Sequence, residues 1–128
     1  MKISDKIAQL EKLEDEIEEF FSRITNYYLK NSPHWSSSVN RSSYRYSSWD
    51  NGTKKGFIRI GVSNGHGDYE NFEISSKILH DEDCDWKKYA DQIISAEVAE
   101  LEEKSAIAKA EREKQERELL AKLKEKYQ

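Results

Sequence analysis

The sequence predicts an α+β fold in which a helix, three antiparallel strands and a second helix follow one another. Apolar residues recur every three or four positions in residues 3–28 and again in residues 86–101, which indicates amphipathic helices. Between these segments the apolar period changes to two, as in half-buried strands. The charged fraction of 36% equals the hydrophobic fraction, so we expect one domain with a small core.

Residues 3–28 are expected to form the first helix, with its apolar stripe buried against the sheet. Ser4 or Asp5 can cap its start, and Asn31-Ser32-Pro33 supplies its stop. The stripe consists of Ile3, Ile7, Leu10, Leu13, Ile17, Phe20, Phe21, Ile24, Tyr27 and Tyr28.

Three short segments are expected to pair as an antiparallel meander. Asp50-Asn51-Gly52 predicts a tight type I′ hairpin between the first two, because Asn and Gly tolerate the positive φ that this turn requires. A second turn at residues 63–68 leads to the third strand. The alternating apolar residues are Tyr44 and Tyr46, then Ile58, Ile60 and Val62, then Phe72 and Ile74.

The last helix can be capped by Asp83 or Asp85, and neither Gly nor Pro interrupts the sequence from there to Gln128. At 1.5 Å per residue it can extend about 64 Å, either as one rod or as two helices hinged between residues 104 and 110. We divide the chain into an α+β domain, residues 1–103, and a protruding charged end, residues 104–128. That end carries an apolar patch, so we expect homo-oligomers through Leu119, Leu120 and Leu123.

Charge is spread unevenly along the chain. Residues 81–103 carry nine acidic residues against two lysines, a net charge of −7, whereas residues 104–128 carry eight basic residues against five glutamates, a net charge of +3. The sequence has no apolar run of the roughly 20 residues that a bilayer requires, and it has one cysteine, Cys84. We therefore expect a cytoplasmic protein without a membrane span.

The central segment offers the sharpest candidate binding surface, because it interleaves aromatic and basic residues. Aromatic faces stack on bases, and Arg and Lys neutralise phosphate, which would suit a nucleotide or, less readily, a nucleic acid. The alternative is that the aromatic residues form the buried face of a half-buried sheet. The candidate nucleotide-binding residues are Trp35, Arg41, Arg45, Trp49, Lys54, Lys55 and Arg59.

Two further clusters give weaker signals. Residues 80–85 bring together His80, Cys84 and several carboxylates, but their spacing matches no zinc or calcium pattern, and a loop that caps the last helix explains them better. The Gly-rich turn around His66 could present N–H groups to an anion, yet a strand follows it where a phosphate site usually opens a helix. No familiar catalytic motif is present, so we expect neither an enzyme nor a metal or cofactor.

A resemblance to a known class of proteins rests on three expected strands, one turn and the helix after them. The strands are Ser43-Tyr44-Arg45-Tyr46, Phe57-Ile58-Arg59-Ile60 and Phe72-Glu73-Ile74-Ser75, and the turn is Ser63-Asn64-Gly65-His66. Over about residues 43–94 the chain resembles small phage-encoded counter-defence proteins, chiefly anti-CRISPR inhibitors and, less closely, sponges of immune signalling nucleotides. The resemblance implies binding that blocks or sequesters, without turnover.

Three hypotheses follow. The first is a phage-type inhibitor in the host cytoplasm that blocks a bacterial immune effector, such as a CRISPR–Cas component. Its acidic residues Asp91, Glu97, Glu100 and Glu102 would imitate nucleic-acid phosphate. The second is a sponge that binds a cyclic nucleotide through the central segment. The third is a structural adaptor that oligomerises through the last helix.

Overall fold

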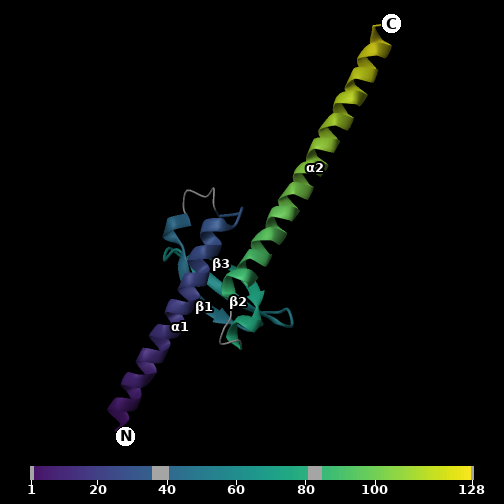
Figure 1. Cartoon of the computed structure of the whole chain (residues 1–128). Coiled ribbons are helices and arrows are strands. Elements are labelled where there is room, and N and C mark those ends of the chain that lie inside the picture. Colours follow the sequence, from purple (N-terminus) through teal and green to yellow (C-terminus); the bar gives the residue numbers. More distant parts are fainter. Residues whose placement is uncertain (1, 36–40, 81–84, 128) are drawn as a thin grey trace.

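The computed structural model describes residues 2–35, 41–80 and 85–127 and confirms the predicted α+β element order (Figure 1). The three strands form one antiparallel sheet in the order β1-β2-β3, as a meander requires. The elements are α1 (Ile3–Asn31), the 3-10 turn η1 (Arg41–Ser43), β1 (Arg45–Asp50), β2 (Phe57–Ser63), β3 (Tyr69–Ser75), the 3-10 turn η2 (Ser76–Leu79) and α2 (Trp86–Lys126).

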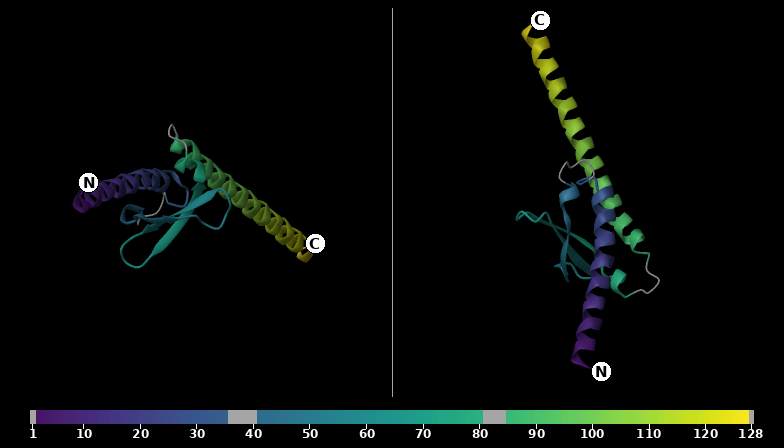
Figure 2. Two further views of the ribbon diagram at one scale, coloured as in Figure 1. Left: turned by 90° about the horizontal axis from the view of Figure 1, so that it is seen from below. Right: turned by 90° about the vertical axis from the view of Figure 1, so that its left-hand side faces the viewer.

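Both helices extend well beyond the folded body of the protein. The N terminus and the C terminus lie at opposite ends of the molecule in every view (Figures 1 and 2). All residues from 2 to 19 are exposed, and so are all residues from 98 to 127. We call residues 3–19 the N-terminal arm and residues 104–127 the C-terminal arm.

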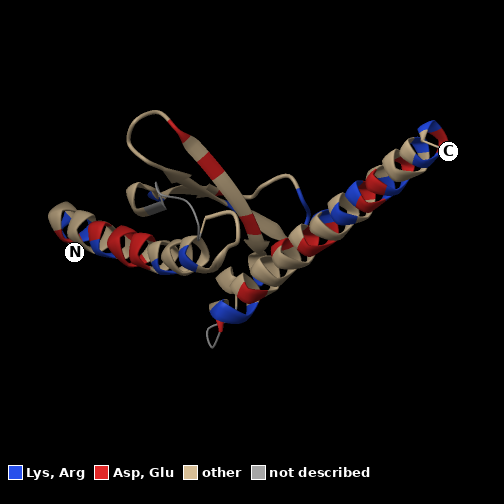
Figure 3. Ribbon diagram, turned by 90° about the horizontal axis from the view of Figure 1, so that it is seen from above, with Lys and Arg blue, Asp and Glu red and all other residues tan. Residues whose placement is uncertain are grey.

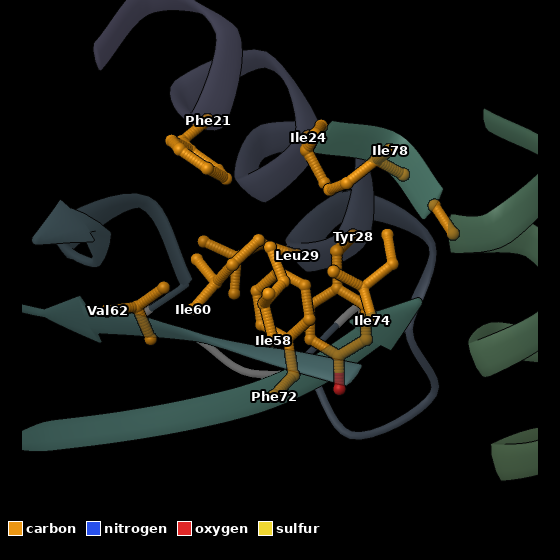
Figure 4. Packing of buried hydrophobic residues seen from close by; sticks show 11 residues of the cluster. Phe21, Ile24, Tyr28, Leu29, Ile58, Ile60, Val62, Phe72, Ile74 and Ile78 are labelled. Atoms are coloured by element: carbon orange, nitrogen blue, oxygen red, sulfur yellow. The ribbon is translucent and has the colours of Figure 1, made fainter. Parts of the chain in front are cut away.

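The core lies between α1 and one face of the sheet (Figure 4). The ring of Tyr28 stacks on that of Phe72 with centroids 4.0 Å apart, which joins α1 to β3. Residues of η2 and of the first turns of α2 complete the core. Its buried members are Phe21, Ile24, Tyr28, Leu29, Ile58, Ile60, Val62, Phe72, Ile74, Ile78 and Ala90.

The prediction that the whole apolar stripe of the first helix is buried is wrong. The 29 residues of α1 span about 43 Å, whereas a seven-residue strand spans about 23 Å, so the small sheet covers only the C-terminal half of α1. Val98 and Leu101 of α2 are likewise exposed, since α2 leaves the body after Glu97. The stripe residues left in solvent are Ile3, Ile7, Leu10, Leu13 and Ile17.

A β-bulge in β1 decides which aromatic residues face α1. Tyr46 pairs with Val62 and Trp49 with Ile60, and the register shifts between Tyr46 and Ser48. The extra residue places Tyr46 and Trp49 on the same face, which simple alternation would not do. Both rings stack on Phe21, with centroids 5.5 and 5.4 Å away.

The connection between β1 and β2 is not the predicted two-residue type I′ turn. The loop spans residues 51–56, and in the described part of the chain only glycines have positive φ, among them Gly52 at 64° and Gly56 at 83°. Asn51 therefore does not adopt the left-handed conformation that type I′ demands. Instead, the carboxylate of Asp50 accepts a hydrogen bond from the N–H of Gly52 at 2.7 Å, as in an Asx turn.

The helix ends agree in part with the predictions. Asp85 caps α2 by accepting a hydrogen bond from the N–H of Lys87 at 3.2 Å, and α1 ends at Asn31 as expected. The predicted cap of α1 at Ser4 or Asp5 is wrong, because both lie inside the helix and Lys2 precedes it without a side-chain cap. Within the described residues α2 is one continuous helix from Trp86 to Lys126, without a hinge.

Candidate functional site

The predicted nucleotide-binding residues do not converge on one site. Trp35 packs edge-on against Tyr44, with centroids 4.7 Å apart, and Trp49 stacks on Phe21. Both indole rings are thus used in packing, which favours the alternative that the aromatic residues belong to the sheet and its flank. Arg41 begins η1, and its side chain lies outside the described residues.

The predicted cations are also dispersed. The guanidinium of Arg59 pairs with Asp50 at 2.8 Å across the β1–β2 pair, and this hydrogen bond holds the pKa of the Asp50 carboxyl below its usual value. Arg45 is exposed at the opposite end of β1, while Lys54 and Lys55 lie on the loop that follows this strand. Of these cations, Lys54 lines a hollow between the sheet and α2.

That hollow is a groove of about 650 Å³ between the β2–β3 pair and the first turns of α2. Lys54, Lys77 and Lys88 line it together with the rings of Phe57 and Tyr89. The ammonium of Lys54 lies 4.3 Å from the centroid of the Phe57 ring, a cation–π contact. Glu73 also lines the groove. Sequence reasoning missed this combination because α2 brings Lys88 and Tyr89 to the sheet from a distant part of the chain.

In the Gly-rich turn at residues 63–68, backbone N–H groups donate hydrogen bonds to side chains of the same turn. The side-chain oxygen of Asn64 accepts hydrogen bonds from the N–H groups of His66, at 2.9 Å, and Asp68, at 3.3 Å. Its side-chain nitrogen donates to the Asp68 carboxylate at 2.9 Å, and the N–H of Gly65 donates to Ser63 at 3.2 Å. These groups are engaged within the turn, which matches a structural loop better than an anion cradle.

Two of the four predicted acidic binding residues tie α2 to α1. Asp91 accepts a hydrogen bond from the hydroxyl of Tyr27, and Glu97 accepts one from Tyr28 and another, at 2.7 Å, from Ser32. The bond to Asp91 raises the pKa of Tyr27, whereas burial, followed by the bond to Glu97, raises the pKa of Tyr28. Both carboxylates therefore act in holding the helices together.

The other two acidic residues, Glu100 and Glu102, are exposed where α2 has left the body. Glu100 pairs with Lys104 one turn later at 3.1 Å, an exposed contact that contributes little to stability. Residues 97–103 contain four glutamates and no basic residue. The charge colouring shows acidic residues here and along the N-terminal arm, with basic residues becoming frequent towards the C terminus (Figure 3).

The predicted apolar patch of the C-terminal arm is in solvent. Leu119, Leu120, Leu123 and Tyr127 have exposed fractions between 43% and 78%, and they recur at three- and four-residue steps, so they share one side of α2. The N-terminal arm exposes a second apolar stripe that the sequence analysis assigned to the core. The chain thus presents two apolar helical surfaces, one at each end.

Residues 81–84, which hold Cys84 and most of the acidic cluster considered for a metal, lie outside the described residues. Among the residues that the structure describes, no group of three or more His, Cys, Asp or Glu side chains could hold a metal ion. None of the helices in this described part combines the length and the apolar character needed to cross a membrane.

Comparisons of the chain with family models, curated proteins and solved structures gave no match.

Proposed function

We propose that this protein is a non-enzymatic inhibitor that binds and blocks a component of bacterial antiviral immunity, as anti-CRISPR proteins do. The observation that carries the proposal is the set of exposed glutamates Glu100, Glu102 and Glu103, an acidic segment displayed on a continuous helix just beyond the point where it leaves the body. An effector that binds nucleic acid has a basic channel, and carboxylates held on a rigid helix can occupy such a channel. The resemblance over residues 43–94 supplies the class of partner.

Phage plating tests the inhibitor proposal directly. Bacteria with an active CRISPR–Cas system directed against a chosen phage are compared with and without expression of this protein, over strains that carry different CRISPR–Cas types. We expect plating to rise by at least about tenfold in one of them, which corresponds to loss of most interference. A strain without CRISPR–Cas controls for general effects on the phage, and unchanged plating in every strain would contradict the proposal.

The acidic segment is tested with charge-neutralising variants that spare the fold. Glu100→Gln with Glu102→Gln removes two exposed carboxylates, whereas Asp91 and Glu97 are unsuitable because they hold α2 against α1. Glu111→Gln with Glu113→Gln, on the same helix, is the matched control. Inhibition that falls in the Glu100/Glu102 variant and persists in the Glu111/Glu113 variant would support binding through the acidic segment. Equal inhibition by the two variants would show that these exposed carboxylates are not needed.

A second candidate function is supported by the lysine-lined groove. Three lysines that line the groove together with Phe57 and Tyr89 suit a small anionic ligand with an aromatic base, such as a cyclic nucleotide. Calorimetry with a panel of cyclic nucleotides tests this function. Lys77→Gln with Lys88→Gln is expected to abolish the heat of binding, whereas Lys55→Gln, on the neighbouring loop outside this groove, should leave it unchanged. No heat with any nucleotide would exclude this function.

A further inference from the structure

Within the residues that the structure describes, no other part of the chain covers the apolar face of the N-terminal arm. Phe21, Ile24 and Tyr28 of α1 are buried by the sheet, and the same three-and-four spacing continues towards the N terminus along the same face. Most helical stability in proteins comes from packing of an amphipathic face, so this arm would gain stability from a contact along its apolar face. The residues that continue the face are Ile3, Ile7, Leu10 and Ile17, with Leu13 beside them, exposed between 48% and 68%.

The spacing of this face matches the seam of a coiled coil. Steps of four, three, seven, four, three and four residues lead from Ile3 to Tyr28, and they fit the alternating four-and-three rhythm of a heptad seam. One seam position is polar, because Glu14 falls within the step of seven between Leu10 and Ile17. An apolar stripe from another helix is therefore the kind of surface that fits the N-terminal arm.

The C-terminal arm supplies such a stripe with the opposite charge. The N-terminal arm carries seven acidic residues and two lysines, a net charge of −5, and the C-terminal arm carries eight basic residues and five glutamates, a net charge of +3. Its apolar residues Leu119, Leu120, Leu123 and Tyr127 lie in the part that also holds Lys122, Lys124 and Lys126. Apolar contact and charge thus favour the pairing of unlike arms over the pairing of like arms.

The two arms of one chain cannot meet, because they extend from opposite ends of the body (Figures 1 and 2). We infer that the C-terminal arm of one copy docks on the apolar stripe of the N-terminal arm of a second copy. This contact is heterologous, since it joins two different surfaces, and it produces closed rings or open chains of copies. The inference rests on the arms alone and is independent of the proposed inhibition, which was argued from residues 100–103.

A mixing experiment distinguishes this pairing from its alternatives. One variant carries Ile7→Ser, Leu10→Ser and Ile17→Ser, and the other carries Leu119→Ser, Leu120→Ser and Leu123→Ser. Light scattering coupled to size exclusion should show the unchanged protein as an oligomer and each variant alone as a monomer. A one-to-one mixture should form a complex of two chains, because each variant keeps the arm that the other has lost.

The other outcomes overturn the inference. Self-association of the variant with a changed C-terminal arm would mean that N-terminal arms pair with one another. Self-association of the variant with a changed N-terminal arm would mean that C-terminal arms pair with one another. An unchanged protein that stays monomeric, or a mixture that stays monomeric, would exclude the contact. Gln9→Ser with Lys12→Ser and Glu16→Ser places three serines on the other side of the same arm and should leave the oligomer intact. Native fluorescence of the tryptophans in the body verifies that each variant is folded.

Discussion

The hydroxyl of Tyr28 donates a hydrogen bond to Glu97, and this contact joins the two helices at the point where α2 leaves the body. The same carboxylate accepts a second hydrogen bond from the buried hydroxyl of Ser32, just after the end of α1. From the next residue onwards α2 is exposed. Glu97 therefore anchors α2 to α1 at the point where the helix leaves the body.

Removal of this anchor should destabilise the fold. Tyr28→Phe keeps the stack on Phe72 and should lower the free energy of unfolding by about 1.5–3 kcal/mol, as expected for one hydrogen bond to a charged acceptor. Glu97→Ala leaves two hydroxyls without their acceptor and should cost about 2–4 kcal/mol. Urea denaturation followed by tryptophan fluorescence measures both. Glu100→Ala is the exposed control, and an equal effect of Glu97→Ala and Glu100→Ala would contradict the role of the anchor.

Thr25 should be a site where a substitution stabilises the protein. Its side chain is fully buried, and its hydroxyl has no hydrogen-bond partner in the described structure. Thr25→Val keeps the shape and removes the unpaired hydroxyl, so it should raise the free energy of unfolding by up to about 1 kcal/mol. Thr25→Ser keeps the hydroxyl and loses a methyl group, so it should lower the stability. Thermal melts by circular dichroism test both, and a lower melting temperature for Thr25→Val would refute this prediction.

The Asp50–Arg59 pair should make stability depend on pH in the acidic range. The pKa of Asp50 is lowered by the hydrogen bond from Arg59 and then by that from the N–H of Gly52. Because the folded state holds this proton less tightly than the unfolded state, the stabilisation is present above the usual pKa of 3.8 and is lost as the pH falls through the folded value. Asp50→Asn should therefore lower the urea midpoint at neutral pH.

The difference between Asp50→Asn and the unchanged protein should shrink as the pH approaches roughly 2, where carboxyl groups are mostly protonated. Asp5→Asn, on the N-terminal arm, controls for the loss of one carboxylate. A midpoint difference that stays constant from neutral to acidic pH would show that the ion pair is not the cause.

Deletion of residues 104–128 should leave the body intact. The described residues of this segment are all exposed, so in dilute protein the free energy of unfolding should change by no more than about 0.5 kcal/mol. The isolated segment should be less helical than the same residues in the protein, because it loses the helical turns of residues 86–103 on which it continues. Chemical denaturation of the shortened chain and circular dichroism of the peptide measure these effects. A loss of several kcal/mol on deletion would reveal a contact between the arm and the body.

Local patterns were sufficient to predict the elements. The three-and-four spacing in α1 and α2, the alternation of Ile58, Ile60 and Val62, and the Asp85 cap depend on neighbours within one or two turns or on adjacent residues. The exposed leucines near the C terminus were also predictable, since the polar stretch of residues 109–118 separates them from the part of the helix that packs on the domain. These parts of the candidate surface needed no tertiary information.

The sequence alone therefore determined the element order and the charged, apolar-tipped end of the chain, whereas the continuity of the last helix, which the sequence left open, was decided by the structure. The tertiary structure decided how much of α1 the small sheet could cover, which aromatic rings the bulge in β1 turned towards α1, and which carboxylates became anchors. Glu97 and Glu100 illustrate the difference: they are alike in sequence, yet only Glu97 lies next to α1 and accepts its hydroxyls. Such roles depend on contacts between segments 60 or more residues apart, which local propensity does not encode.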